Sequence, residues 1–333
     1  MVGFVIRRML SALLVLILTS MIVFAIFYLG PRNPAKGLCD AQQRCTPEKL
    51  ANIERAMGLD KPVVTAYGEW AEGLFRGRQV SFSEAEVYDC SAPCLGVSYD
   101  TRLEVTEELG QKYPATLSLA LGGAALYLAL GVFIGVLAAK YRNTVADKLL
   151  VSSTLVVSAI PYYVIALLAW IFLTQKWPVF PNTQYNSLFD NPWLWFTGLL
   201  LPWLVLGLTN ATAYSRFTRG QMVETINEDF IRTAVAKGQK GNVVIFRHAL
   251  RAAIIPVITI FGLDFGTLLG GTVFTEQIFR IDGMGRWGLD AVTSPTNIPV
   301  VTATVLVAAF FIILSNLVVD IIYSFLDPRV RLS

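Results

Sequence analysis

The segment "NEDFIRTAVAKGQKGNVVIFRHALRAAIIP", residues 227–256, is polar and basic, yet it lies in a strongly apolar chain. Of the 333 residues, 54% are hydrophobic and only 15% are charged. Soluble domains have about 25% charged residues, so this composition predicts a membrane protein. A connection between two membrane spans needs only a few residues. The length of this polar segment therefore indicates a role beyond connection.

The rest of the chain contains six long apolar segments, each at or beyond the roughly 20 residues that a helix needs to cross a bilayer. They span residues 9–29, 114–139, 149–175, 192–215, 252–275 and 298–326. We therefore predict an all-α membrane protein with six transmembrane helices. Pro161 should kink the third helix, because proline removes a backbone donor. The first apolar run is longer than that of a signal peptide and lacks a small-residue cleavage motif after it, so we expect it to be retained.

Basic residues are concentrated on one side of the predicted membrane. They lie before the first span, between the second and third, between residues 216 and 251, and at the C-terminus. By contrast, residues 31–112 contain ten basic and thirteen acidic side chains. The positive-inside rule then places both termini in the cytoplasm. The net charge of +3 mostly reflects this asymmetry and gives no reason to expect nucleic-acid binding.

Residues 31–112 should form a small extracytoplasmic cap. Thr46 followed by Pro47 predicts the start of a short helix, and Gly58 predicts its end. Residues 65–75 have the pattern of a second amphipathic helix. The following residues, 75–100, show no clear period, so we expect them to be irregular.

All four cysteines lie in this cap, and the single histidine, His248, is on the other side of the predicted membrane. An oxidising compartment favours disulfides, and four cysteines allow three pairings. Free thiols are the alternative, and the position of His248 makes a metal site less favoured. The cysteines concerned are Cys39, Cys45, Cys90 and Cys94.

The polar segment has the pattern of two short helices joined by a glycine turn. Residues 225–228, "TINE", match a capping box, and the helix should continue to Lys237 and end at Gly238. Asn242 should cap a second helix that carries Val243, Val244 and Phe246 towards the fifth span. A loop that only fixes topology would explain the basic residues but not exposed apolar ones, and a DNA-binding helix-turn-helix would be unusual beside membrane spans. Exposed apolar residues favour a docking element for a cytoplasmic partner.

At these residues the chain resembles a known family. "DFIRTAVAKG", residues 229–238, resembles the EAA-type loop of binding-protein-dependent ABC importers, in the variant of dipeptide and oligopeptide permeases. The matching positions are Arg232, Thr233, Ala234 and Gly238. Further segments resemble the first of that family's two permease subunits: "YPATLSLAL" at 113–121, "TVFTEQIFRIDGMGRWGLDAV" at 272–292 and the C-terminal span. The cap departs from the family pattern at "GPRNP" and "RGRQVSFS".

The resemblance implies the type I ABC importer permease fold and an importer of short peptides in a bacterial plasma membrane. It implies three kinds of partner: a second permease subunit, two ATP-binding subunits and an extracytoplasmic substrate-binding protein. ATP and Mg would bind to the ATPase subunits, because this chain has no phosphate-binding loop of the Gly-x-x-x-x-Gly-Lys-Ser/Thr type. We therefore expect that the chain itself is not an enzyme and that it holds no cofactor or metal. Nickel chelates and glutathione are alternative cargoes within the family.

On this basis the chain divides into an N-terminal segment with the first span (1–30), the cap (31–112), a permease core (113–326) and a cytoplasmic tail (327–333). The coupling loop, 216–251 within the core, would transmit motion from the ATPase to the fourth and fifth helices. The residues assigned to it are Arg232, Thr233, Ala234, Gly238, Val243, Phe246 and Arg247.

Two aspartates lie within apolar spans, which by default indicates function. Asp264 could line the cargo path and attract a peptide's ammonium group, or it could be satisfied by a neighbouring helix. Gly262, Gly266 and Gly270 share a face of its helix and should allow close packing. Asp320 fits a structural pairing better. A proton-driven secondary transporter using both aspartates is an alternative, but no inverted repeat is visible.

Overall fold

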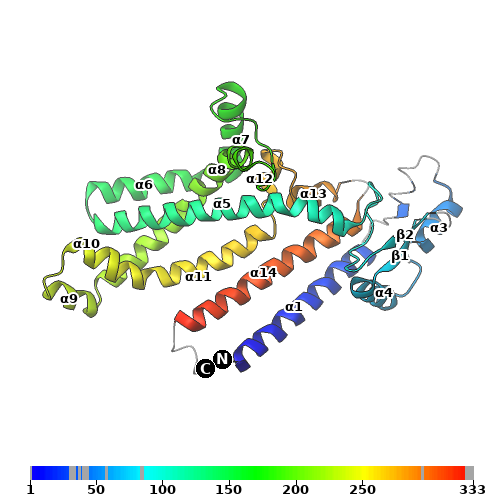
Figure 1. Ribbon diagram of the computed structural model, residues 1–333, viewed down its shortest axis with the longest axis horizontal. Helices are drawn as coiled ribbons and strands as arrows, with labels where there is room; N and C mark the ends of the chain where they lie inside the picture. Colours follow the sequence, from blue (N-terminus) through cyan, green and yellow to red (C-terminus); the bar gives the residue numbers. More distant parts are fainter. Residues whose placement is uncertain are drawn as a thin grey trace. The chain divides into compact units, whose positions relative to one another are not determined.

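The computed structural model describes residues 2–29, 35, 36, 39, 45–56, 59–82, 86–293 and 296–326 (Figure 1). The chain forms two compact units. Unit 1 comprises Met1–Thr116 and Asp282–Leu314, and unit 2 comprises Leu117–Ile281 and Ser315–Ser333. Two long helices, α5 (Val105–Lys140) and α14 (Ile298–Leu326), contribute residues to both units.

Five helices in the described part are long and apolar enough to cross a membrane, and a bent pair adds a sixth span if it is counted as one. Besides α5 and α14 they are α1 (Val2–Leu29), α8 (Pro192–Ile226) and a helix over Gly241–Leu269. Five of the six predicted spans are single helices, and the third corresponds to the bent pair. Several helices extend beyond the apolar runs because their polar ends continue the same helix.

The bent pair consists of α6 (Val145–Ala159) and α7 (Tyr162–Trp170), which continues into the π-helix η1 (Ile171–Lys176). The two arms meet at 87°. Ile160 has φ −90° and ψ 127°, the extended conformation that a following proline favours. The predicted kink at Pro161 is confirmed, but it is a break between two helices rather than a bend within one.

Glycines allow close packing within unit 2. A Cβ at Gly131 or Gly135 of α5 would clash with α8, and one at Gly262 of α11 (Leu250–Leu269) would clash with Val319 of α14. Ser315 Oγ donates a hydrogen bond of 2.6 Å to the Gly262 carbonyl. Close packing is therefore confirmed at Gly262, whereas Gly270 is the C-cap of α11 and ends the helix.

The extracytoplasmic part predicted from the sequence lies in unit 1. Helix α3 (Pro47–Ala56) begins as predicted, with the Lys49 N–H bound to Thr46 Oγ1 at 3.2 Å. Helix α4 (Val63–Arg76) is the predicted second helix. The predicted helix end at Gly58 and the departure "GPRNP" lie outside the described residues, as do Ser83 of "RGRQVSFS" and the tail 327–333.

The region expected to be irregular contains a β-hairpin. Strand β1 (Arg78–Ser81) pairs antiparallel with β2 (Val87–Cys90), and Arg78 lies opposite Cys90. Each strand has only 4 residues, too few for a period-two pattern to be visible in the sequence. Buried Phe82, next to β1, packs edge to face on Tyr88 and Tyr99, which gives the hairpin a small aromatic core.

The structure joins Cys39 to Cys45 and Cys90 to Cys94. The paired residues are 6 and 4 positions apart in the sequence, so each disulfide closes a short loop.

Along the chain, two short helices follow α11 and precede α14: α12 (Val273–Ile278) and α13 (Met284–Asp290).

Candidate functional site

Helix α9 (Asp229–Ala236) is the short helix at the centre of the polar segment. Its N-cap is Glu228, which is extended and makes no side-chain capping bond. The predicted capping box is therefore wrong, because Thr225 still belongs to the last turn of α8. Asp229 is in the first turn of α9, and it forms an ion pair of 3.2 Å with Arg232.

The C-terminus of α9 is a Schellman motif centred on Gly238. The Gly238 N–H donates to the Val235 carbonyl at 2.9 Å, and the Gln239 N–H donates to the Ala234 carbonyl at 3.4 Å. Gly238 has φ +75°, a left-handed conformation that glycine adopts most readily. The predicted end of the helix at Gly238 is confirmed.

The second predicted helix is not a separate element. Helix α10 (Gly241–Val243) follows Lys240 as N-cap, so Asn242 lies inside the helix and does not cap it. From there the chain continues through the π-helix η2 (Val244–Ala249) into α11 without a break, and the combined helix covers Gly241–Leu269. Residues between Gly238 and Gly241 are thus a short link between α9 and a membrane-spanning helix.

One face of α9 packs on a hydrophobic cluster of unit 2. Ile231 and Ala234 are buried there against Val136 and Ala139 of α5, Met222 of α8, and Val244, Ala249 and Ala253 of the following helix. Ala234 is thus a packing residue, and its small side chain lets α9 lie close to the helices beneath it. Thr233 donates its hydroxyl to the Asp229 carbonyl at 2.9 Å, within α9 itself.

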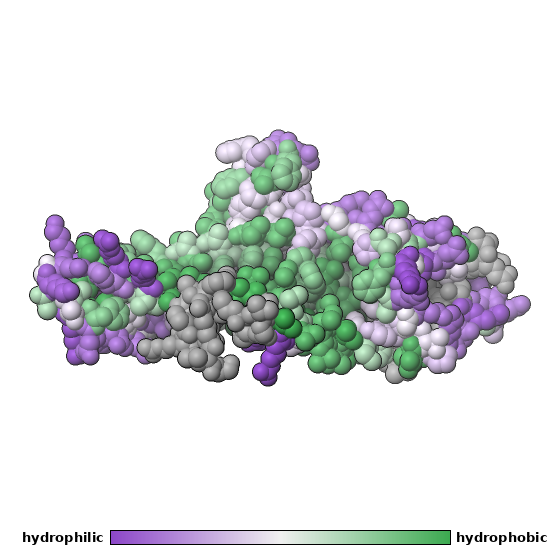
Figure 2. Space-filling view, turned by 60° about the horizontal axis from the view of Figure 1, so that its bottom comes forward, coloured by the Kyte–Doolittle hydropathy of each residue, from purple (hydrophilic) through white to green (hydrophobic). Residues whose placement is uncertain are grey.

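The two sides of α9 that flank its buried face, and the start of the next helix, expose large apolar side chains. Val243 and Phe246, as predicted, are 37% and 46% exposed, and Phe230 and Val235 of α9 are 49% and 59% exposed. We call these four residues the α9 surface. Exposed Arg232 and Arg247 lie among them, and Figure 2 shows hydrophilic and hydrophobic patches mixed at the end of unit 2 that carries α9 and α10. Contiguous exposed apolar residues with polar neighbours are typical of protein interaction sites.

A bidentate ion pair ties the helices beneath α9 together. Arg219 of α8 donates from Nε and Nη2 to the two carboxylate oxygens of Asp147 of α6, both at 2.7 Å. Asp147 is 4% exposed and also accepts the Asn143 N–H at 3.0 Å. Planar bidentate pairs of this kind fix orientation as well as adding energy. Sequence reasoning missed this pair because its members are 72 residues apart and neither belongs to a recognisable motif.

A second bond fixes the turn after α9. His248 Nε2 and Gln239 Oε1 are 2.7 Å apart, so the single histidine joins the Gly238 turn to η2. This bond, together with the buried face of α9, couples the position of α9 to that of the long helix Gly241–Leu269.

Asp264 lies on α11 and has an exposed side chain. The hydroxyl of Tyr214, on α8, donates a hydrogen bond of 2.7 Å to its Oδ2. Tyr214 in turn packs on Tyr127 of α5, with ring centroids 4.8 Å apart. Asp264 therefore has a hydrogen-bond partner on a neighbouring helix, while its side chain is exposed in this chain.

Two family models cover almost the whole chain. The first, described as the inner membrane component of binding-protein-dependent transport systems, matches residues 131–332, and its N-terminal companion matches residues 1–120. The chain belongs to this family. The permease is thus a multi-pass inner-membrane component of an ABC importer, and α9 falls within the first of these matches.

Named relatives match the permease along its full length. The dipeptide transport system permease protein DppB of Alkalihalophilus pseudofirmus is 32% identical over 351 residues, covering 99% of this chain and 100% of the relative. DppB of Escherichia coli K12 is 31% identical over 354 residues, covering 99% of both chains. Among solved structures, a chain of the MetNI methionine ABC transporter matches with a TM-score of 0.55 and 14% identity, covering 67% of the permease and 97% of that chain. This last likeness supports the type I importer permease fold.

Proposed function

We propose that the permease is one half of an ATP-driven importer of short peptides and that a separate ATPase subunit docks on the α9 surface. The full assembly contains a second permease subunit, two ATP-binding subunits that hold ATP and Mg, and an extracytoplasmic substrate-binding protein. Peptide cargo is supported by the names of the full-length relatives, which are dipeptide transport permeases. A nickel chelate or glutathione is the alternative cargo.

The observation that carries the proposal is the construction of α9. Exposed apolar residues flank its outer face, while its inner face is buried on helices α5 and α8 and on the continuous helix Gly241–Leu269. A force applied to the outer face therefore reaches membrane-spanning helices through packed contacts rather than through a flexible loop. The Asp147–Arg219 pair extends this connection to α6. A loop that only fixed the topology would need neither exposed apolar residues nor a buried face packed on the membrane-spanning helices.

The proposed topology places both termini and α9 in the cytoplasm and residues 31–112 outside, with the chain divided at residues 30, 112 and 326. A reporter that is active only in the cytoplasm should be active when it is fused at residue 140 or 333. A reporter that is active only outside the cytoplasm should be active when it is fused at residue 90. A cytoplasmic reporter that works at residue 90 would contradict this arrangement.

Reconstitution tests the function directly. The permease, its partner subunits and the binding protein should take up a labelled dipeptide into proteoliposomes only when ATP is present on the ATPase side. Uptake driven by a proton gradient without ATP would favour the secondary-transporter alternative. ATP-driven uptake of a nickel chelate or glutathione, with no dipeptide uptake, would keep the importer and change its cargo.

A further inference from the structure

Unit 1 contains a cavity of about 590 Å³ beside helix α4 and strand β1. Cavities of about 300–1,000 Å³ have the size that binds small organic molecules. Four basic and two acidic side chains line it, so the lining has an excess of positive charge: Arg55, Lys61, Arg76, Arg78, Glu69 and Glu72. The apolar part of the lining includes Phe82 and Pro299.

Arg78 brings a half-buried positive charge to this cavity. Within the described residues its Nε is buried without a hydrogen-bond partner, and no ion pair joins it to a carboxylate. Burial lowers the pKa of Arg78, and the negative charge of Glu69 opposes this effect. Both oxygens of Glu69 bind Lys61 Nζ, at 2.8 and 2.7 Å, so Glu69 is already engaged. Leaving the buried Nε of a half-buried guanidinium without a hydrogen-bond acceptor is costly, and an anionic ligand would offset that cost.

The Arg78 side chain passes close to two glycines, Gly73 and Gly96, whose lack of a side chain makes room for it. A Cβ at Gly73 of α4 would come within 2.7 Å of Arg78 Cδ. A Cβ at Gly96 would lie 3.0 Å from Pro299 Cβ and 3.8 Å from Arg78 Nη2. The arginine is therefore held between α4 and the Gly96 turn, beside the cavity.

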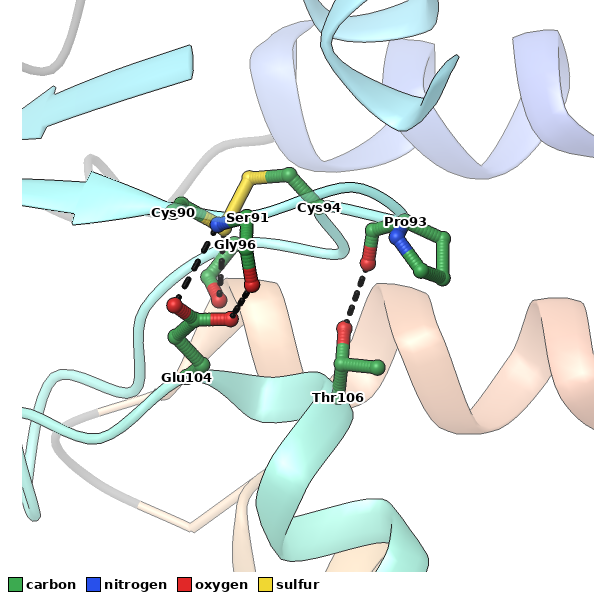
Figure 3. Close-up of a disulfide and its surroundings, with 7 residues drawn as sticks. All are labelled: Cys90, Ser91, Pro93, Cys94, Gly96, Glu104 and Thr106. Carbon is green, nitrogen blue, oxygen red and sulfur yellow. Dashed lines mark hydrogen bonds between the residues drawn. A yellow bond between two sulfur atoms is a disulfide. The ribbon is translucent and has the colours of Figure 1, made fainter. Parts of the chain in front are cut away.

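The turn that contains Gly96, which lines the cavity, is cross-linked (Figure 3). Cys90, which lies opposite Arg78 in the hairpin, is joined to Cys94, and the Ser91 N–H and hydroxyl donate to the Glu104 carboxylate at 3.2 and 2.8 Å. The Thr106 hydroxyl donates to the Pro93 carbonyl at 2.6 Å. These bonds fix the turn that contains Gly96 to the start of α5. A binding group supported in this way is held rigidly, which favours a specific site.

Tyr99 supplies a neutral donor beside Arg78. Burial raises the pKa of its hydroxyl, so the group remains protonated. The Tyr99 backbone N–H donates to Asn297 Oδ1 at 3.2 Å, and its ring packs on Phe82 with centroids 5.7 Å apart. The cavity thus places a guanidinium and a phenol next to an apolar wall.

We propose that this cavity binds the carboxylate of a small organic acid through Arg78 and that its ligand is the C-terminus of a short peptide. The planar guanidinium matches a carboxylate with two parallel hydrogen bonds, and the apolar wall suits a side chain next to that carboxylate. The identification of the ligand as a peptide rests on the proposed function. Inorganic phosphate has the same kind of oxygen atoms and is the competing source of an anion.

Calorimetric titration of the assembled importer, without its binding protein, tests the site. The probes are the dipeptide Ala-Phe, its C-terminal amide and inorganic phosphate. Ala-Phe should bind, the amide should bind at least tenfold more weakly, and Arg78→Gln should weaken Ala-Phe binding at least tenfold. Arg78→Lys keeps the charge and should show an intermediate loss. Lys49→Gln, which removes a positive charge of α3 outside the cavity lining, should bind Ala-Phe within twofold of the unchanged protein.

Equal binding of Ala-Phe and its amide, or unchanged binding by both Arg78 variants, would overturn the proposal. Phosphate binding that depends on Arg78, without dipeptide binding, would overturn the assignment to a peptide. ATP-driven dipeptide uptake measured on the same preparations separates the two ideas. Normal uptake without Arg78-dependent binding refutes the cavity site and leaves the transport function standing.

Discussion

Replacing Gly238 should uncouple ATP hydrolysis from transport, because this residue sets the geometry of the end of α9. Gly238 has φ +75°, and no atom of the described residues lies within 4 Å of where a Cβ would be. The whole effect of a substitution is therefore conformational and not steric. An L-residue in the left-handed region costs about 1–2 kcal/mol, with β-branched residues at the upper end.

A residue that leaves this conformation gives up both bonds of the Schellman motif, from Gly238 to Val235 and from Gln239 to Ala234. A change of about 1–2 kcal/mol shifts the balance between the ordered and the frayed end of α9 by about 5- to 30-fold. A helix of 8 residues has little stability of its own and depends on its contacts, so this shift should be visible.

The assay measures peptide uptake and ATP hydrolysis on the same proteoliposomes. Gly238→Val should lower uptake per ATP hydrolysed by about 5-fold or more, from the same estimate. Gly238→Asn should stay close to the unchanged protein, because asparagine tolerates the left-handed region. Gly220→Val is the matched control, since Gly220 also has open space around its Cβ position but lies within helix α8. Normal coupling in Gly238→Val would refute the reasoning.

Three further predictions test the surroundings of the site. Arg219→Gln leaves the 4%-exposed Asp147 without its bidentate partner and should destabilise the assembled permease by about 2 kcal/mol. Adding Asp147→Asn to this variant should restore part of the lost stability. Thermal unfolding in detergent measures both variants, and an unchanged unfolding midpoint in Arg219→Gln would contradict the stabilising role of the pair. If Asp264 lines the cargo path, Asp264→Asn should reduce uptake of peptides with a free N-terminus more than uptake of N-acetylated peptides, at equal amounts of assembled complex. If Asp264 is instead a packing residue held by Tyr214, the same substitution should lower the stability of the complex and reduce uptake of both peptides alike. Non-reducing mass spectrometry should find Cys39 linked to Cys45 and Cys90 to Cys94, and four alkylatable thiols in fresh membranes would exclude the disulfides.

The sequence was informative wherever the determinants are local. Apolar length predicted every span, Pro161 predicted the break between α6 and α7, and Thr46 and Gly238 marked helix ends that the structure confirms. Each of these depends on one residue's backbone chemistry or on a run of similar side chains. The exposure of Val243 and Phe246 followed from apolar residues in a polar segment.

Features that depend on tertiary contacts were missed or misplaced. Thr225 has a capping pattern, but α8 continues to Ile226, and α9 begins only at Asp229. Asn242 is a good N-cap by residue type, yet the helix already begins at Gly241 and continues into the membrane span. The Asp147–Arg219 pair and the Arg78 cavity each combine residues from distant segments, so a single sequence offered no pattern for either.

The most direct test of the central claim is photo-crosslinking from the α9 surface in the assembled importer. A photoactivatable side chain at Val235, which is 59% exposed on α9, should form a covalent adduct with the ATPase subunit. The same side chain at Val64 of α4, which is 83% exposed in the proposed extracytoplasmic cap, should form none. An intact assembly that gives no ATPase adduct from Val235, Phe230 or Phe246 would contradict the claim that α9 couples this permease to ATP hydrolysis.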